Sequence, residues 1–182
     1  MTNFETALNR LFQVEGEFSR HAADRGGATK YGVTEAVARA NGYTSRMEDM
    51  SPETAARIAK SQYWDTLRLD EISRLSYPIA YELLDTGYNA GIGTAGIILQ
   101  RALNALNREQ KDYPDVVADG VIGPMTVNAL RLYLVKRGSE GEKVLLRQLN
   151  ALQGNHYIAL AEKDKSQEAF VYGWFLNRVE MS

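Results

Sequence analysis

The stretch EGEFSRHAADRGGATKYGVT, residues 15–34, decides how this chain is interpreted. It follows a segment whose apolar residues recur at helical spacing, which predicts a first helix ending near Gly16. Gly26, Gly27 and Gly32 inside the stretch are turn signals. We therefore expect an N-terminal helix followed by a small β-hairpin or loop excursion.

Helical periodicity dominates the rest of the chain. Helix-start signals occur at Thr2 with Glu5, at Thr34, at Ser51 before Pro52, and at Ser76 before Tyr77-Pro78. The polar, proline-containing residues 109–124 predict a linker or large loop. Further helices are expected from residue 93 to about residue 103 and over residues 125–137, 143–162 and 167–179.

The amino-acid composition argues against several classes of function. The chain has 182 residues with a formal net charge of −2, which lacks the basic excess typical of nucleic-acid-binding domains. It has no cysteine and only two histidines, His21 and His156, so thiolate metal sites are excluded and little material remains for a zinc site or a Ser-His-Asp triad. We expect no metal and no organic cofactor.

No stretch is apolar enough to predict a transmembrane helix, and the first residues lack the pattern of a secretory signal. We therefore expect a protein made in a bacterial cytoplasm without a signal peptide, with no membrane insertion and no nucleic-acid partner. We also expect a monomer. If its target is the cell wall in the periplasm, release through a holin-like pore is the expected route.

The polar side chains of the opening stretch suggest glycosidic cleavage. Glu15, Asp24 and Thr29 supply one carboxylic acid to protonate a leaving oxygen, one carboxylate to activate water or stabilise positive charge, and a hydroxyl to orient the water. At a helix C-terminus the negative pole of the macrodipole raises the pKa of Glu15, as a general acid requires. The plainer interpretation is that Glu15 is solvated and that Asp24 is a turn former.

A family resemblance favours the chemical interpretation. E-G-E-F at residues 15–18, D-R-G-G-A-T at 24–29 and Y-G-V-T at 31–34 resemble the N-terminal motif of the family-108 glycoside hydrolases, which are N-acetylmuramidases common among phage endolysins. Residues 63–70 and the run D-T-G-Y-N-A-G at 85–91, followed by L-Q-R-A-L, resemble later motifs of that family. Residues 118–124 and 173–178 resemble the peptidoglycan-binding domain that usually follows.

The resemblance implies roles for particular residues. Glu15 would be the general acid, and Asp24 with Thr29 would hold water or stabilise charge. Tyr31, Asn89, Tyr88 and Asp85 are candidate substrate-binding residues. For three of them a structural alternative stays open: hairpin packing for Tyr31, a helix cap for Asn89, and a hydrogen-bonding role for Asp85.

The chain departs from the family pattern at three positions. Glu17 replaces a glycine, Leu84 replaces a phenylalanine, and Tyr88 replaces a valine. Glu17 would raise the pKa of Glu15 if the two carboxylates approached each other, but we expect Glu17 to point to solvent. Trp64 and Trp174 are expected to pack within the protein rather than to serve as sugar platforms.

The expected fold class is mainly α: a lysozyme-like helical fold with a small N-terminal β-hairpin, plus a helical peptidoglycan-binding unit. The expected domains are residues 1–94 for catalysis and residues 95–182 for peptidoglycan binding, closely packed. The helix that begins at Thr94 has a broad apolar surface, for which aromatic residues of the last helix are candidate covers: Phe170, Trp174 and Phe175.

The expected activity is hydrolysis of the β-1,4 bond between N-acetylmuramic acid and N-acetylglucosamine in peptidoglycan glycan strands, causing lysis of the host cell wall. Two alternatives stay open. A non-catalytic cell-wall-binding protein would keep the fold without the reaction. A lytic transglycosylase would use the same glutamate but form an anhydro product without water.

Overall fold

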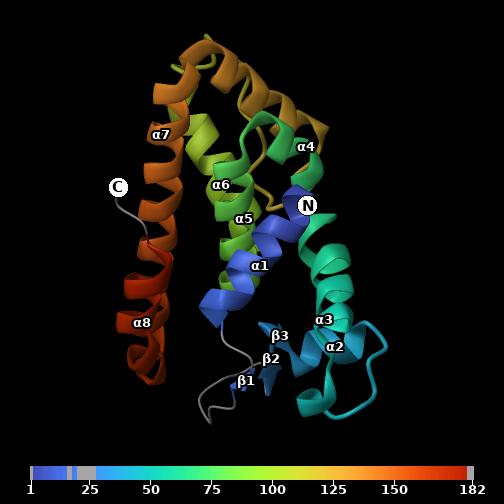
Figure 1. The fold of residues 1–182 in the computed structure, drawn as a ribbon. Helices are drawn as coiled ribbons and strands as arrows, with labels where there is room; N and C mark the ends of the chain where they lie inside the picture. Colours follow the sequence, from blue (N-terminus) through green and yellow to red (C-terminus); the bar gives the residue numbers. More distant parts are fainter. Residues whose placement is uncertain (1, 16–17, 20–27, 180–182) are drawn as a thin grey trace. The chain divides into compact units, whose positions relative to one another are not determined.

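The computed structural model describes residues 2–15, 18–19 and 28–179, with the backbone alone for residues 13–15, 18 and 19 (Figure 1). The chain divides into two compact units, residues 1–65 and 66–182. Helices dominate the described residues, and one small antiparallel sheet lies near the N-terminus. The expected mainly α fold class is confirmed.

The first unit begins with α1 (Asn3–Glu15), which opens with the expected capping box. The backbone N–H of Thr2 donates to Glu5 Oε2 at 2.8 Å, and the N–H of Glu5 donates to Thr2 Oγ1 at 3.2 Å. In the same first turn, the ring of Phe4 meets Trp64 edge to face with the centroids 5.4 Å apart. Trp64 is fully buried, so its expected packing role is confirmed.

Three two-residue strands follow α1: β1 (Phe18–Ser19), β2 (Thr29–Lys30) and β3 (Val33–Thr34). They pair antiparallel in the order β1-β2-β3. Tyr31 and Gly32 connect β2 to β3 with φ angles of 51° and 73°. Two consecutive positive φ angles make the two-residue turn that matches the natural twist of a hairpin. The predicted hairpin is therefore present, and it has one strand more than a simple hairpin.

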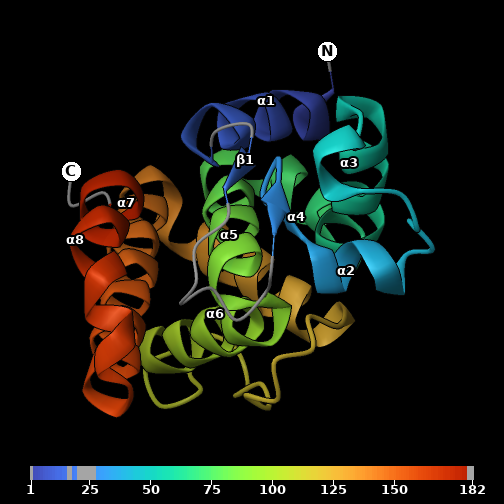
Figure 2. The same cartoon turned by 90° about the horizontal axis from the view of Figure 1, so that it is seen from below.

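The remaining helices of the first unit are α2 (Glu35–Ala40), the 3₁₀ turn η1 (Met47–Asp49), α3 (Pro52–Ala59) and the π-helical turn η2 (Lys60–Trp64). Thr34 caps α2 and Ser51 caps α3, as predicted. Figure 2 shows the strands beside α1 and α2. Side chains from β3, α2, η1 and α3 form one apolar cluster: Val33, Ala38, Met47, Met50, Ala55 and Ile58.

The second unit is built around α5 (Tyr77–Ala90), whose residues from Ile79 to Tyr88 are all buried. Ser76 caps it, and Pro78 stands in its first turn. α4 (Leu69–Leu75), α6 (Ile92–Leu106) and α7 (Pro124–Lys163) pack against it. The sequence did not predict α4, because Arg68 precedes it with a φ of 53° and no side chain caps it.

α7 was expected as two helices, and the structure joins them across a kink. Gly138 has a φ of 59° and a ψ of −150°, and the helix continues on both sides, as the bent ribbon in Figure 1 shows. The predicted break is therefore correct in place but shorter than expected. The short turn η3 (Lys165–Gln167) then leads into α8 (Glu168–Arg178), which lies alongside α7.

Candidate active site

The end of α1 and the β2–β3 turn lie together in the first unit. The ring of Phe12, in the last turn of α1, packs on the ring of Tyr31 with the centroids 5.2 Å apart. Glu15 is the last residue of α1, one helical turn beyond Phe12. The chain therefore brings the backbone of Glu15, the proposed acid, to the same part of the unit as β2, the strand that carries Thr29 and its proposed water-orienting hydroxyl.

The three proposed catalytic residues differ in how far the structure describes them. The backbone of Glu15 is described, but its side chain lies outside the description, and Asp24 lies outside the described residues entirely. Thr29 is half-buried in β2, where it pairs with Ser19 and Thr34. Placing Glu15 at the C-terminus of α1 agrees with the electrostatic argument, because the negative pole of the helix disfavours a carboxylate there.

Tyr31 occupies a left-handed backbone conformation that bulky residues rarely adopt. Its ring packs on Phe12 and belongs to the side chains that surround the apolar cluster of the first unit. Lys30 Nζ lies 4.8 Å from the ring centroid, within the range of a cation–π contact. The structural alternative of hairpin packing is thus present, and a role in binding substrate stays a prediction.

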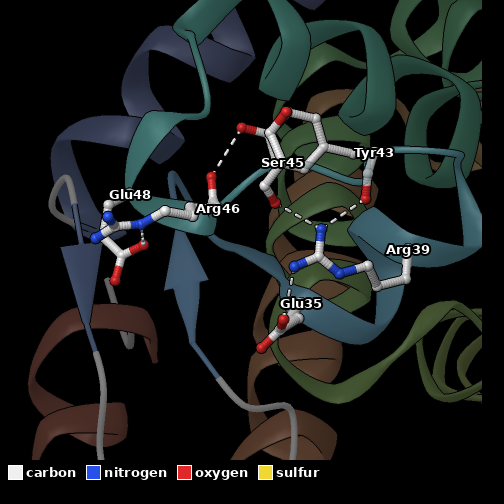
Figure 3. A network of polar contacts seen from close by, with 6 residues as sticks. All are labelled: Glu35, Arg39, Tyr43, Ser45, Arg46 and Glu48. Carbon is white, nitrogen blue, oxygen red and sulfur yellow. Dashed lines mark hydrogen bonds and ion pairs between the residues drawn. The ribbon is translucent and has the colours of Figure 1, made fainter.

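A polar network holds the segment that follows α2 (Figure 3). Arg39 Nη1 donates to the backbone carbonyls of Tyr43 and Ser45, each at 2.7 Å, while Nη2 pairs with Glu35 Oε1 at 2.7 Å. The Tyr43 hydroxyl donates to the carbonyl of Arg46 at 2.9 Å. One guanidinium therefore fixes the chain that leads into η1 and the apolar cluster behind β3.

The residue Asp85, proposed from the second motif, lies in a buried ion pair of the second unit. Arg178 Nη1 of α8 donates to Asp85 Oδ1 at 2.7 Å, and Gln153 Nε2 of α7 donates to Asp85 Oδ2 at 3.1 Å. The side chains of Asp85 and Arg178 are each only 7% exposed. The carboxylate thus connects α5 to both α7 and α8, which is the structural role left open for it.

Tyr88 and Asn89 follow Asp85 on α5. Tyr88 is buried and Asn89 is half-buried in the last turn of the helix. Both lie in the second unit, whereas Tyr31 lies in the first. Their roles in binding substrate remain predictions. Arg178 and Gln153 were not proposed from the sequence, because they stand 93 and 68 residues from Asp85 and no local pattern links them.

The L-Q-R-A-L run that follows the α5 motif and the motif at residues 118–124 meet at the Gln100 side chain. Its Nε2 donates to Asp119 Oδ1 and to the carbonyl of Val121, both at 3.0 Å, and its Oε1 accepts from the N–H of Gly120 at 2.8 Å. The N–H of Val121 and the Gln100 amide hold the pKa of Asp119 below its ordinary range. A Cβ on Gly96 would lie 2.1 Å from the Gly120 carbonyl oxygen, so only glycine allows this approach.

An aromatic stack joins α7 to α8. Trp174 stacks on the buried Tyr157 with centroids 4.8 Å apart, and on Phe170 with centroids 5.7 Å apart. Phe175 meets Tyr157 edge to face at 6.3 Å. Neighbouring rings therefore occupy Trp174, which confirms that it packs within the protein. These aromatic side chains stack on α7, whereas the sequence suggested them as a cover for α6.

Within the described ranges, no group of three or more histidine or carboxylate side chains is arranged to hold a metal ion. Among the same residues, no helix is both long and apolar enough to cross a membrane.

Comparisons with known proteins agree with the motif order. The family model described as glycosyl hydrolase 108 matches residues 8–91, and the model described as predicted peptidoglycan domain matches residues 94–179. No curated protein matches the chain. Among solved structures, SagA of Brucella abortus is 24% identical over 94% of this chain and 86% of that chain, with a TM-score of 0.71, which shows a shared fold.

The two family matches follow each other in the order that the motifs predict, and the first includes the positions of Glu15, Asp24 and Thr29. The chain therefore carries a glycosyl hydrolase 108 segment over residues 8–91, followed by a predicted peptidoglycan domain over residues 94–179.

Proposed function

We propose that this peptidoglycan hydrolase is an N-acetylmuramidase that hydrolyses the β-1,4 bond between N-acetylmuramic acid and N-acetylglucosamine. The observation that carries the proposal is the match to glycosyl hydrolase 108 over residues 8–91, which includes the ordered set of Glu15, Asp24 and Thr29. The predicted peptidoglycan domain that follows supports a cell-wall substrate.

In the proposed reaction, the protonated carboxyl of Glu15 donates its proton to the glycosidic oxygen, which leaves as the 4-hydroxyl of N-acetylglucosamine. Positive charge then develops at C1 of the muramic acid ring. The carboxylate of Asp24, with the Thr29 hydroxyl, stabilises that charge or directs a water molecule to C1. The water supplies the new hydroxyl, and its proton returns through a carboxylate to Glu15 or to solvent.

The local fold supports this division of roles. Glu15 ends a helix, where the backbone carbonyls favour the protonated acid. Thr29 stands on a strand held in register by a tight turn, and the Phe12–Tyr31 contact joins that turn to the last turn of α1. A proton donor and a water-orienting hydroxyl both need such fixed neighbours, since small displacements cost catalytic rate.

The cellular role that fits this activity is lysis of a bacterial cell wall, as by a phage endolysin, with the protein acting as a monomer. The proposed division of labour assigns catalysis to residues 1–94 and peptidoglycan binding to residues 95–182. The same family assignment leaves a lytic transglycosylase and a non-catalytic wall-binding protein as the competing functions.

Mass spectrometry of the fragments released from purified sacculi tests the proposal. A muramidase releases muropeptides with a reducing N-acetylmuramic acid end, and incubation in H₂¹⁸O places ¹⁸O at that end. Products ending in anhydromuramic acid would assign a transglycosylase, and a reducing N-acetylglucosamine end would assign a glucosaminidase. Binding to sacculi without any released fragment would leave only the wall-binding function.

A further inference from the structure

The junction between α7 and α8 forms an open groove in the second unit. It has a cavity volume of about 460 Å³, which falls within the range of small-ligand sites. Residues of three consecutive elements line it: Ile158, Ala161 and Glu162 of α7, Lys165 of η3, and Glu168 and Val171 of α8.

Three charged side chains surround the groove without any internal partner. In the part of the chain that the structure describes, Glu162, Lys165 and Glu168 form no side-chain hydrogen bond and no ion pair, and all three are exposed. The neighbouring Asp164 differs, because its carboxylate accepts from the N–H of Ser166 and caps η3. The groove therefore presents two anions and one cation that remain available to a ligand.

The rest of the lining is apolar and aliphatic. Ile158 is 47% exposed, and Ala161 and Val171 add methyl groups beside it. One helical turn beyond Glu168 on α8, the ring of Tyr172 is 79% exposed. Small apolar contacts and unpaired charges of both signs thus occur on one surface.

This chemistry distinguishes between the two components of peptidoglycan. A glycan strand presents hydroxyl and acetamido groups, which aromatic faces and side-chain amides recognise, and the groove lining contains neither. A stem peptide presents the methyl groups of alanine, free carboxylates and, on its diamino acid, an ammonium group. The carboxylates complement Lys165, the ammonium complements Glu162 and Glu168, and the methyl groups complement Ile158 and its neighbours.

We propose that the α7–α8 groove binds the stem peptide of peptidoglycan. The inference rests on the proposed function in its choice of peptidoglycan as the target. In this arrangement the two halves of the chain recognise different parts of one polymer, with the glycosidase segment acting on the sugar backbone and the groove holding the peptide that branches from it.

Methyl NMR on the full-length chain tests the groove directly. The probe is a soluble tetrapeptide of L-alanine, D-isoglutamate, meso-diaminopimelate and D-alanine, titrated against protein labelled at isoleucine, alanine and valine methyls. We expect saturable shifts at Ile158, Ala161 and Val171. Chitotriose, which carries the sugar groups without a peptide, should leave these three signals in place.

Charge variants show whether the peptide is recognised as proposed. Lys165→Glu, and separately Glu162→Gln with Glu168→Gln, should weaken tetrapeptide binding by about three- to tenfold, since each removes exposed charge pairs of modest strength. Lys163→Glu is the matched control, because Lys163 is exposed near the same helix end but does not line the groove. It should bind as the wild type does.

Several outcomes would overturn the inference. These are methyl shifts with chitotriose only, no shift with the tetrapeptide, unchanged affinity in the charge variants, or shifts that follow protein concentration alone, which would assign the groove to a second copy of the chain. The result is separable from the proposed activity, because Glu15→Gln protein should bind the tetrapeptide normally while releasing no fragments from sacculi.

Discussion

The N-terminal motif and the α5 motif both contain carboxylates, and they lie in different units of the chain. Thr29 of the first motif is half-buried on a short strand of a hairpin, beside the end of α1. Asp85 of the second motif is buried, and α7 and α8 each supply a donor to it. A family motif can therefore include a residue such as Asp85, whose contacts in the fold are those of a buried ion pair.

The largest expected effect comes from removing the helices that hold the second motif. A chain of residues 1–94 keeps α4 and α5 but loses α7, which packs against both. Each large buried side chain contributes about 1.5–3 kcal/mol, and a domain is stable by only about 5–15 kcal/mol. We expect the short chain to lose cooperative thermal unfolding and lytic activity together.

Differential scanning calorimetry and a turbidity assay on permeabilised cells, run beside the full-length protein, check this expectation. A cooperative transition near the full-length temperature, with activity retained, would show that residues 1–94 form an independent catalytic domain. The contacts of α5 with α7 would then not be needed to stabilise the α5 motif.

Glu15→Gln should reduce the rate of sacculus hydrolysis by about 10²–10⁴-fold, because glutamine keeps the shape of the side chain but donates no acidic proton. Asp24→Asn should also be severely impaired, and Thr29→Ala less so. The melting temperature should stay close to that of the wild type in each case. Glu17→Gln is the matched control and should remain active. Activity within about threefold of wild type for Glu15→Gln would remove the acid from the mechanism.

Arg178→Met, unlike Glu15→Gln, should lower the stability of the protein before it affects the rate of hydrolysis. It removes the Arg178 ion pair from the buried Asp85 carboxylate, a change that typically costs about 3–5 kcal/mol. Urea unfolding of the full-length chain measures the loss. Arg131→Met, at an exposed position of α7, is the control and should change stability by less than about 0.5 kcal/mol. If both variants unfold alike, the ion pair does not hold the three helices together.

Arg39→Ala should destabilise the first unit by about 1 kcal/mol, because it removes donors from two backbone carbonyls at a partly exposed site. Arg46→Ala offers a comparison within the same network (Figure 3), since its guanidinium lies 3.5 Å from Glu48 and is 77% exposed. Its effect should be near zero. Equal losses measured by urea unfolding would contradict the anchoring role of Arg39.

The smallest effect concerns Asp119, whose pKa is held below the ordinary value of 3.8 by its hydrogen bonds. A lowered pKa contributes stability above the ordinary value, and that stability is lost as pH falls through the folded-state pKa. Asp119→Asn should therefore melt slightly below the wild type at pH 7 and converge with it as pH falls through the lowered pKa of Asp119. Asp49→Asn, at an exposed position, should follow the wild type throughout. If the difference in melting temperature between Asp119→Asn and the wild type persisted in acid, it would come from the changed shape of the side chain and not from its charge.

Much of the fold could be predicted because its signals are local. Caps at Thr2, Thr34, Ser51 and Ser76 fix helix starts through side-chain to backbone contacts within three residues. The kink at Gly138 lies between the two helices expected over residues 125–137 and 143–162. By contrast, α4 begins after Arg68, which has a left-handed backbone conformation and no capping side chain, so no local sequence pattern predicts this helix.

The candidate site could be predicted only as a set of residue types in order. Nothing local indicates that Asp85 meets Gln153 and Arg178, because those contacts form between helices far apart in sequence. The role of Gln100 is similar: its partners in the loop before α7 follow about 20 residues later and appear only once that loop has folded back onto α6.

The Asp85–Arg178 ion pair also limits how early the contact between α5 and α8 can form during synthesis. The two residues are separated by 93 positions, so a ribosome adding about 5–20 residues per second needs roughly 5–20 s to deliver the arginine after the aspartate. During that interval the ion pair between Asp85 and Arg178 cannot form. Closing so long a loop is also entropically slow. The ion pair is therefore expected to form late in synthesis, after the whole sequence between the two residues has been made.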